Sequence, residues 1–229
     1  MLNRIKYIGI VMAVFGMAFI LAGGYALMKV QEGQRSLTAF SAAQNVTLNY
    51  NDQGQLVDRG DPAGAAAIMS LLTNDWGYPV QAAELNPNDR VVNTASEYMF
   101  QMATITYHTL NGEQTVVLDE DYTAKDGTVY TAGVEYTVPV AGRYWSQFDR
   151  TNPVDAIVRE KAWTGTAHAL IGELGVGTAT ASSLQMGLGL AGLFAGVGFM
   201  FILTGLGLVW ATRPETAKVP VLRPALQPA

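Results

Sequence analysis

Carboxylates form the densest cluster of metal-binding side chains in the sequence. Asp119-Glu120-Asp121 is followed by Asp126, and hard oxygen ligands at such close spacing can bind Ca²⁺. An EF-hand loop starting at Asp119 would need glycine at its sixth position and glutamate at its twelfth, where this sequence has Ala124 and Tyr130. The motif therefore fails. We interpret the segment as a solvated acidic hairpin, in which the remaining metal candidates are Asp119, Asp121 and Asp126.

Histidine and cysteine chemistry is limited by the scarcity of these residues. The chain has no cysteine and only two histidines, His108 and His168, which excludes zinc–cysteine sites, iron–sulfur clusters and thiol catalysis. No phosphate-binding loop, HExxH or GxSxG motif occurs, and no nucleophile is marked by its spacing from either histidine. The sequence therefore predicts neither an enzyme nor a cofactor.

Three further residues are candidates for an interface. Glu173 is the last charge before a long apolar stretch, where it could bind a lipid head group, a cation or a basic partner, or simply be solvated. Trp145 and Trp163 belong to an aromatic cluster with Tyr144 and Phe148. This cluster could form a core, or it could be an exposed patch that marks a contact site.

Two long uncharged stretches must position these residues. Residues 7–28 contain no charge, and a helix of that length is about 33 Å long, enough to cross the roughly 30 Å hydrocarbon core of a bilayer. A signal peptide would have a shorter apolar region, so we expect an uncleaved anchor. Residues 174–210 are also uncharged. We place the second span at 186–210 and expect the preceding residues to be an extension of its helix or a short break.

Lysine and arginine predict the orientation of the two spans. The segments 1–6 and 211–229 together hold five basic residues and one acid, whereas the rest of the chain holds nine basic residues and eighteen acids. Basic residues near spans favour the cytoplasmic side. We therefore expect cytoplasmic termini, a proline-rich tail at 211–229 and an extracytoplasmic domain at 29–185, with the chain in the cytoplasmic (inner) membrane.

Small residues recur in both spans and predict close helix packing. Gly192 and Gly196 form a GxxxG pair, flanked by Ala191 and Ala195, and such surfaces allow helix backbones to approach closely in lipid. The partner could be the other span of this chain or a different protein. Neither span contains aspartate, glutamate, lysine, arginine or histidine, which argues against a proton path or channel formed by this chain alone.

The pattern between the spans predicts a small α+β domain. Apolar spacings of three and four indicate helices, and alternating β-rich segments indicate strands, with the later strands forming an antiparallel meander. We expect helices at 34–44, 63–73, 89–110 and 154–174, and strands at 46–50, 55–57, 114–118, 128–130 and 134–140. The predicted fold class is a membrane protein with two transmembrane α-helices flanking a small α+β extracytoplasmic domain.

A resemblance to known proteins rests on both ends of the chain, NRIKYIGIVMAVFGMAFILAGG at the start and AGRYWSQFDRTNPVDAIVREKAWTGTAHALIGELGVG with FILTGLGLVWA towards the end. In these segments the sequence resembles uncharacterised actinobacterial two-span membrane proteins with an exported domain. Some of those proteins are labelled aromatic ring-opening dioxygenases. An iron site for such chemistry would need histidines and a carboxylate, and two distant histidines do not provide one.

These observations predict a function in binding rather than catalysis. We expect a non-enzymatic accessory or scaffold subunit of a larger complex in the bacterial cytoplasmic membrane. The resemblance implies that this complex is a respiratory or cell-envelope assembly. The expected partners are membrane lipid and other membrane-protein subunits, and not nucleic acid. The alternative is a membrane-anchored sensor or ligand-binding module whose acidic outer domain binds a cation or cationic molecule.

Overall fold

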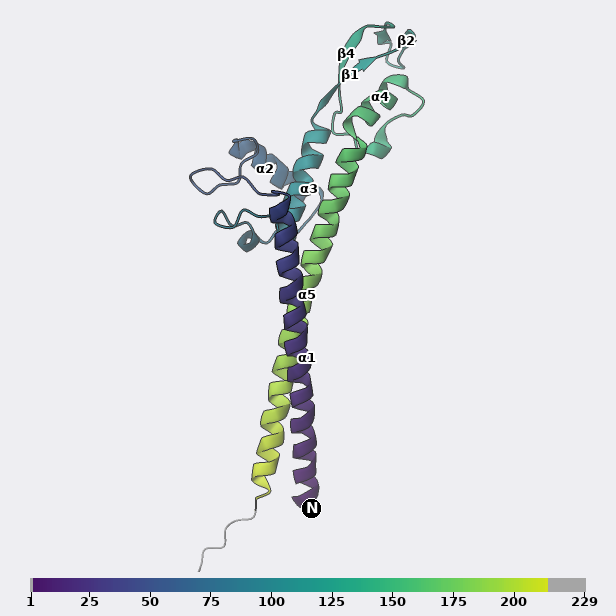
Figure 1. The fold of residues 1–229 in the computed structure, drawn as a ribbon. Helices are drawn as coiled ribbons and strands as arrows, with labels where there is room; N and C mark the ends of the chain where they lie inside the picture. The colour runs from purple at the N-terminus through teal and green to yellow at the C-terminus, as the bar shows by residue number, and fades with distance from the viewer. Residues whose placement is uncertain (1, 214–229) are drawn as a thin grey trace, which may run out of the picture. The chain divides into compact units, whose positions relative to one another are not determined.

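A computed structural model describes residues 2–213, so most of the predicted tail at 211–229 lies outside the described residues. The described chain contains five α-helices, four strands and three short helical turns (Figure 1). The α-helices are α1 (Leu2–Ala43), α2 (Pro62–Ser70), α3 (Ala95–Leu110), α4 (Pro153–Ala162) and α5 (Gly165–Ala211). The strands are β1 (Glu113–Val117), β2 (Tyr122–Thr123), β3 (Val129–Tyr130) and β4 (Glu135–Pro139), and the short turns are η1 (Leu71–Asp75), η2 (Ala82–Glu84) and η3 (Trp145–Gln147).

The chain divides into two compact units. Of the described residues, the first unit, which we call the hairpin unit, contains 2–30 and 187–213; the second, the central unit, contains residues 31–186. Helices α1 and α5 each contribute one part to each unit. The prediction of two long apolar helices flanking a small α+β region is confirmed.

Both long helices expose their apolar side chains. Among the described residues, α1 and α5 are the two helices long and apolar enough to cross a membrane, and only 11% of the most apolar window of each is buried within the chain. A core helix of a soluble protein would be mostly buried. Helix α5 runs without interruption from Gly165 to Ala211, which confirms the expected helical extension before residue 186.

Within the hairpin unit, α1 and α5 run antiparallel and touch through glycines. A Cβ atom on Gly16 would lie 2.5 Å from the carbonyl oxygen of Gly198, and one on Gly23 would lie 2.8 Å from that of Ala191. Gly9 meets Gly205 in the same way. The contacts on each helix recur every seven residues, the repeat of helices that supercoil around each other. Close backbone approach therefore holds these segments together.

In the central unit, the longest predicted soluble helix, 89–110, is shorter than expected. Helix α3 starts at Ala95 and not at Asp89, because Thr94 and Glu97 form a capping box that fixes its first turn. The preceding segment is extended instead. Val92 N donates to the Val46 carbonyl at 3.0 Å, and Val91 is bridged to Thr47. The predicted strand at 46–50 is accordingly reduced to single bridges.

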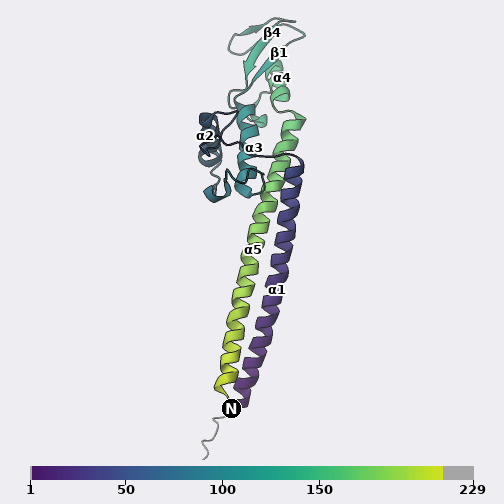
Figure 2. The same cartoon turned by 60° about the vertical axis from the view of Figure 1, so that its left-hand side comes forward.

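The β region also differs from the predicted meander. Strand β1 pairs antiparallel with β4, from Glu113 opposite Pro139 to Val117 opposite Glu135, and the short pair β2–β3 lies between them in sequence. A meander would have paired consecutive strands. The strands are therefore two nested hairpins, which both views place beside α4 (Figures 1 and 2).

The predicted helix at 154–174 is wrong as a single helix. Asn152 caps the start of α4 through its side-chain oxygen, but the helix stops at Trp163, whose backbone leaves the helical region at φ −98° and ψ 63°. Thr164 then accepts a hydrogen bond from Ala167 N at 3.1 Å and so caps α5. Trp163, whose side chain packs in the core, ends α4, and the Thr164 cap begins α5. The segment therefore forms two helices.

Two apolar clusters form the core of the central unit. One gathers residues of α2 and α3 with Leu48, Tyr50, Leu174 and Ala181. The other gathers residues of β1 and α4 with Phe148 and Trp163. Leu174 belongs to α5, so the first cluster joins α3 directly to that helix.

Candidate functional site

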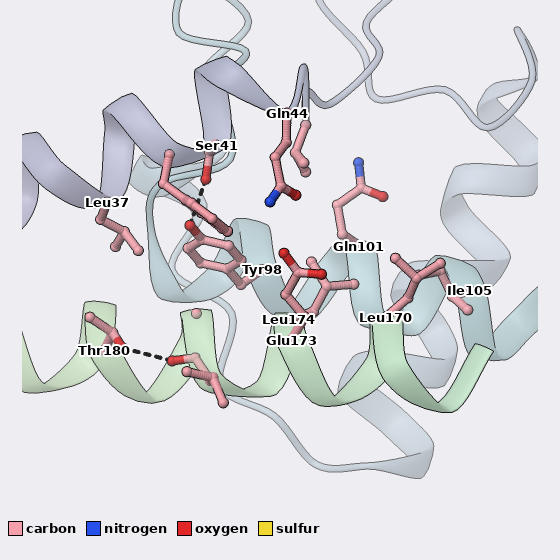
Figure 3. Close-up of a pocket in the computed structure, with 14 residues that line it drawn as sticks. Leu37, Ser41, Gln44, Tyr98, Gln101, Ile105, Leu170, Glu173, Leu174 and Thr180 are labelled. Atoms are coloured by element: carbon pink, nitrogen blue, oxygen red, sulfur yellow. Dashed lines mark hydrogen bonds between the residues drawn. The ribbon is translucent and has the colours of Figure 1, made fainter. Parts of the chain in front are cut away.

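An apolar pocket of about 400 Å³ lies in the central unit between the end of α1, α3 and α5 (Figure 3). Its volume is within the range of sites for small ligands, roughly 300–1,000 Å³. We call it the three-helix pocket. Its lining residues are Leu37, Phe40, Ser41, Gln44, Val46, Tyr98, Gln101, Ile105, Leu170, Glu173, Leu174, Val176, Gly177 and Thr180.

Helical spacing explains why these residues meet. Residues three and four apart share a helix face. The contributions of α3 (Tyr98, Gln101 and Ile105) and of α5 (residues 170, 173, 174 and 177) follow this spacing. Helix α1 supplies the third wall because it continues beyond the apolar stretch as far as Ala43.

A hydrogen bond and a glycine shape the floor of the pocket. The hydroxyl groups of Ser41 and Tyr98 lie 2.7 Å apart, and both residues are buried. A Cβ atom on Gly177 would lie 2.5 Å from the Tyr98 ring, so only glycine lets α5 lie against this ring. Burial raises the pKa of the Tyr98 phenol, the Ser41 hydrogen bond opposes this shift, and the Glu97 and Glu173 carboxylates reinforce it.

Among the residues that line this pocket, Glu173 is the charged one. Figure 3 shows its carboxylate pointing from α5 towards the region between Gln44 and Gln101. The Gln101 amide nitrogen donates to the Thr47 carbonyl at 2.8 Å, which leaves the amide oxygen as an acceptor. In the part of the chain that is described, no lysine, arginine or histidine forms an ion pair with Glu173. The pocket can therefore bind an apolar group and offer a negative charge at its edge.

The predicted aromatic candidates lie outside this pocket. Trp163 is only 6% exposed and belongs to the second core cluster, where its indole nitrogen donates to the Arg143 carbonyl at 3.1 Å. Trp145 is half-buried and lies beneath the Arg159 guanidinium, 4.4 Å from the ring centroid. For Trp163 the structure shows core packing rather than an exposed contact patch.

The acidic candidates do not come together as a metal site. Among residues 2–213, no group of three or more histidine, cysteine, aspartate or glutamate residues is placed to bind a metal ion. Asp121 accepts from Ala132 N at 2.8 Å, and Asp126 accepts from Thr128 N at 3.0 Å. This hydrogen bond to Thr128 holds the pKa of Asp126 below its ordinary value. Asp119 lines a shallow surface depression beside α4. Asp121 and Asp126 therefore accept hydrogen bonds from the backbone of the nested hairpins.

The two histidines occupy separate environments. His108 Nε2 lies 2.9 Å from the Asp58 carboxylate, at the end of α3. The ring of His168 lies against Trp145 and Trp163, at centroid distances of 5.2 and 5.8 Å. Neither histidine lines the three-helix pocket.

The predicted GxxxG surface divides into two parts in the structure. Ala191 and Ala195 contact α1 near Gly23. Gly192 and Gly196 are different, because a Cβ atom on either would meet nothing within 4 Å. They line a shallow groove on α5 together with Leu193, Val197, Met200 and Phe201.

Sequence reasoning found Glu173 but missed the other polar residues of the pocket, namely Ser41, Gln44, Tyr98 and Gln101. A signal was present for α3, since Tyr98, Met102 and Ile105 follow the helical spacing of four and three residues. Nothing local marks Ser41, which meets Tyr98 across 57 positions of sequence.

Comparisons with known proteins add no relative. No family model matches the chain, and neither the curated proteins nor the solved structures yield a match. The resemblance to actinobacterial two-span proteins accordingly stays a prediction.

Proposed function

We propose that this chain is a non-enzymatic accessory subunit anchored in a bacterial cytoplasmic membrane by two spans, with residues 29–185 outside. The apolar, exposed surfaces of α1 and α5 support membrane insertion, because such surfaces are unfavourable in water and favourable in lipid. The distribution of lysine and arginine supports the orientation. A respiratory or cell-envelope assembly is the proposed host, on the basis of the resemblance alone.

The groove at Gly192 and Gly196 is the observation that carries the role of a subunit. The glycines that pack α1 against α5 already contact the opposite helix, whereas a Cβ atom on Gly192 or Gly196 would meet nothing within 4 Å. Large apolar side chains, Met200 and Phe201, flank the groove. A helix of another membrane subunit can approach such a surface closely and gain van der Waals contact. We therefore propose a transmembrane helix of a different subunit as the occupant.

Purification from native membranes tests this role. Tagged full-length protein, extracted in mild detergent, should retain a defined set of membrane subunits at fixed ratio. Leucine at both Gly192 and Gly196 should remove that set because it fills the groove. Thr204→Leu is the matched control, since it adds bulk at an exposed position of α5 that does not line the groove. Loss of the partners from both variants, or from neither, would contradict the proposal. Purification of the protein as a homo-oligomer without other subunits would also contradict it.

The three-helix pocket favours a second candidate function. An apolar site with a single unpaired carboxylate is suited to binding a cationic molecule. A ligand-binding module of this kind is compatible with the proposed anchoring and requires no catalytic residue.

A further inference from the structure

We propose that the three-helix pocket binds a membrane amphiphile, with its alkyl chain against the apolar walls and an ammonium head group beside Glu173. This inference rests on the proposed membrane anchoring and the external position of the central unit. It adds a ligand class and a binding site to that function.

The walls of the pocket suit an alkyl chain. Leu37, Ile105 and Leu174 line it from three different helices. Three large apolar residues of its lining remain substantially exposed, Phe40 at 51%, Leu170 at 42% and Val176 at 67%. Covering such side chains is favourable by about 25 cal/mol for each Å² of apolar surface removed from water. An alkyl chain is unbranched and can follow the pocket between the helices.

Charge selects the head group. The Glu173 carboxylate has no cationic partner among the described residues, and the amide oxygen of Gln101 remains an acceptor. An ammonium group donates hydrogen bonds and carries the complementary charge, so it satisfies both groups. An anionic head group without an amine would be repelled by Glu173.

The route along the chain points to the membrane as the source. Leu37 follows the end of the predicted first span by nine residues, and Thr180 precedes the start of the predicted second span by six. Both residues stand on helices that continue directly into the apolar stretches. Under the proposed topology, a lipid of the outer leaflet is therefore the nearest abundant molecule with the required chemistry.

Photo-crosslinking in nanodiscs tests the proposal. Full-length protein is placed in phosphatidylcholine nanodiscs that contain a lipid with a diazirine in its acyl chain, either phosphatidylethanolamine or phosphatidylglycerol. Mass spectrometry then locates the labelled peptides. We expect phosphatidylethanolamine to label segments 37–46, 98–105 and 170–180 about threefold more than phosphatidylglycerol does, because an exposed charge pair contributes modestly to affinity.

Two variants and a control identify the residues responsible. Glu173→Gln should remove the difference between the two lipids. Val176→Trp fills the pocket from an exposed position and should reduce labelling by both lipids. Glu120→Gln removes the same charge from an exposed residue that does not line the pocket, and it should behave like the unmodified protein.

The outcomes separate this proposal from the proposed anchoring. Three outcomes would overturn the ligand assignment without contradicting membrane insertion. They are equal labelling by both lipids, labelling confined to other segments, and an unchanged lipid preference in Glu173→Gln. Extraction of the protein from membranes by alkaline carbonate would instead overturn the anchoring. Finding a peptide of another protein in the pocket would also overturn the assignment.

Discussion

Tyr98 connects three helices of the central unit through a single side chain. Its hydroxyl group meets Ser41 of α1, its ring lies against Gly177 of α5, and its backbone belongs to α3. A change at any of these contacts should therefore affect the pocket as well as stability.

Gly177→Ala tests how closely α5 must approach this ring. The new methyl group would lie 2.5 Å from buried ring atoms, so the ring must move and the Ser41 hydrogen bond must lengthen. We expect a loss of about 1–3 kcal/mol in the free energy of unfolding, typical of overpacking. Gly175→Ala is the control, because its methyl group meets nothing within 4 Å and alanine favours a helix by roughly 1 kcal/mol over glycine. Denaturant unfolding in detergent would measure both, and equal effects would refute the close contact.

Glu97 should make the free energy of unfolding depend on pH. The residue is 1% exposed, and burial raises its pKa above the ordinary 4.5, although hydrogen bonds from Asn93 and Thr94 oppose the shift. Between 4.5 and the raised pKa, the folded chain holds more protons than the unfolded chain. The free energy of unfolding therefore falls as pH rises through this window.

Glu97→Gln should remove this dependence. Asn93 N and Thr94 N both donate to one carboxylate oxygen, each at 2.9 Å, and an amide oxygen can accept both bonds. We expect the variant to be more stable than the unmodified protein at neutral pH, and the difference to shrink as pH falls towards 4.5. Unfolding curves across this range would measure it. Parallel pH profiles would show that Glu97 does not titrate in this window.

At the scale of helices and strands, the sequence predicted which segments are regular better than how they end and pair. A helix in the region of α3 was predicted correctly, but its start depends on the reciprocal bonds of Thr94 and Glu97. Pairing β1 with β4 rather than with β2 is a long-range choice that no local pattern encodes. The end of α4 depends on Trp163, which packs into a core formed by distant segments. Glu173 could be found because its position beside an apolar stretch is itself a sequence feature.

Packing of α1 on α5 provides a prediction for a pair of elements. Gly16→Leu would place a side chain where the Gly198 carbonyl oxygen lies 2.5 Å from the new Cβ, so the helices must separate. We expect a lower melting temperature in detergent, corresponding to about 1–3 kcal/mol. Gly24→Leu lies on the same helix and meets nothing within 4 Å, so it should melt like the unmodified protein. Identical melting of all three proteins would contradict the glycine contacts.

For the whole molecule, the uneven distribution of charge and apolar residues was the most informative property of the sequence. The two uncharged stretches predicted the two long helices that the structure contains, and the spacing of apolar residues between them predicted the α+β region. The partner of the open groove at Gly192 and Gly196 could not be predicted in this way. Small residues indicate where a helix can approach, but they carry no chemistry that selects one partner.

Orientation in the membrane is the prediction that belongs to the whole chain. Five of the six charges in the segments 1–6 and 211–229 are basic, and retention of lysine and arginine on the cytoplasmic side should leave both ends inside. The chain has no cysteine, so a single introduced thiol reports its own location. In intact cells, a membrane-impermeant maleimide should label Glu120→Cys, whereas Asn3→Cys should react only after permeabilisation. The reverse pattern would invert the topology and move the three-helix pocket to the cytoplasmic side, where an outer-leaflet lipid could not reach it.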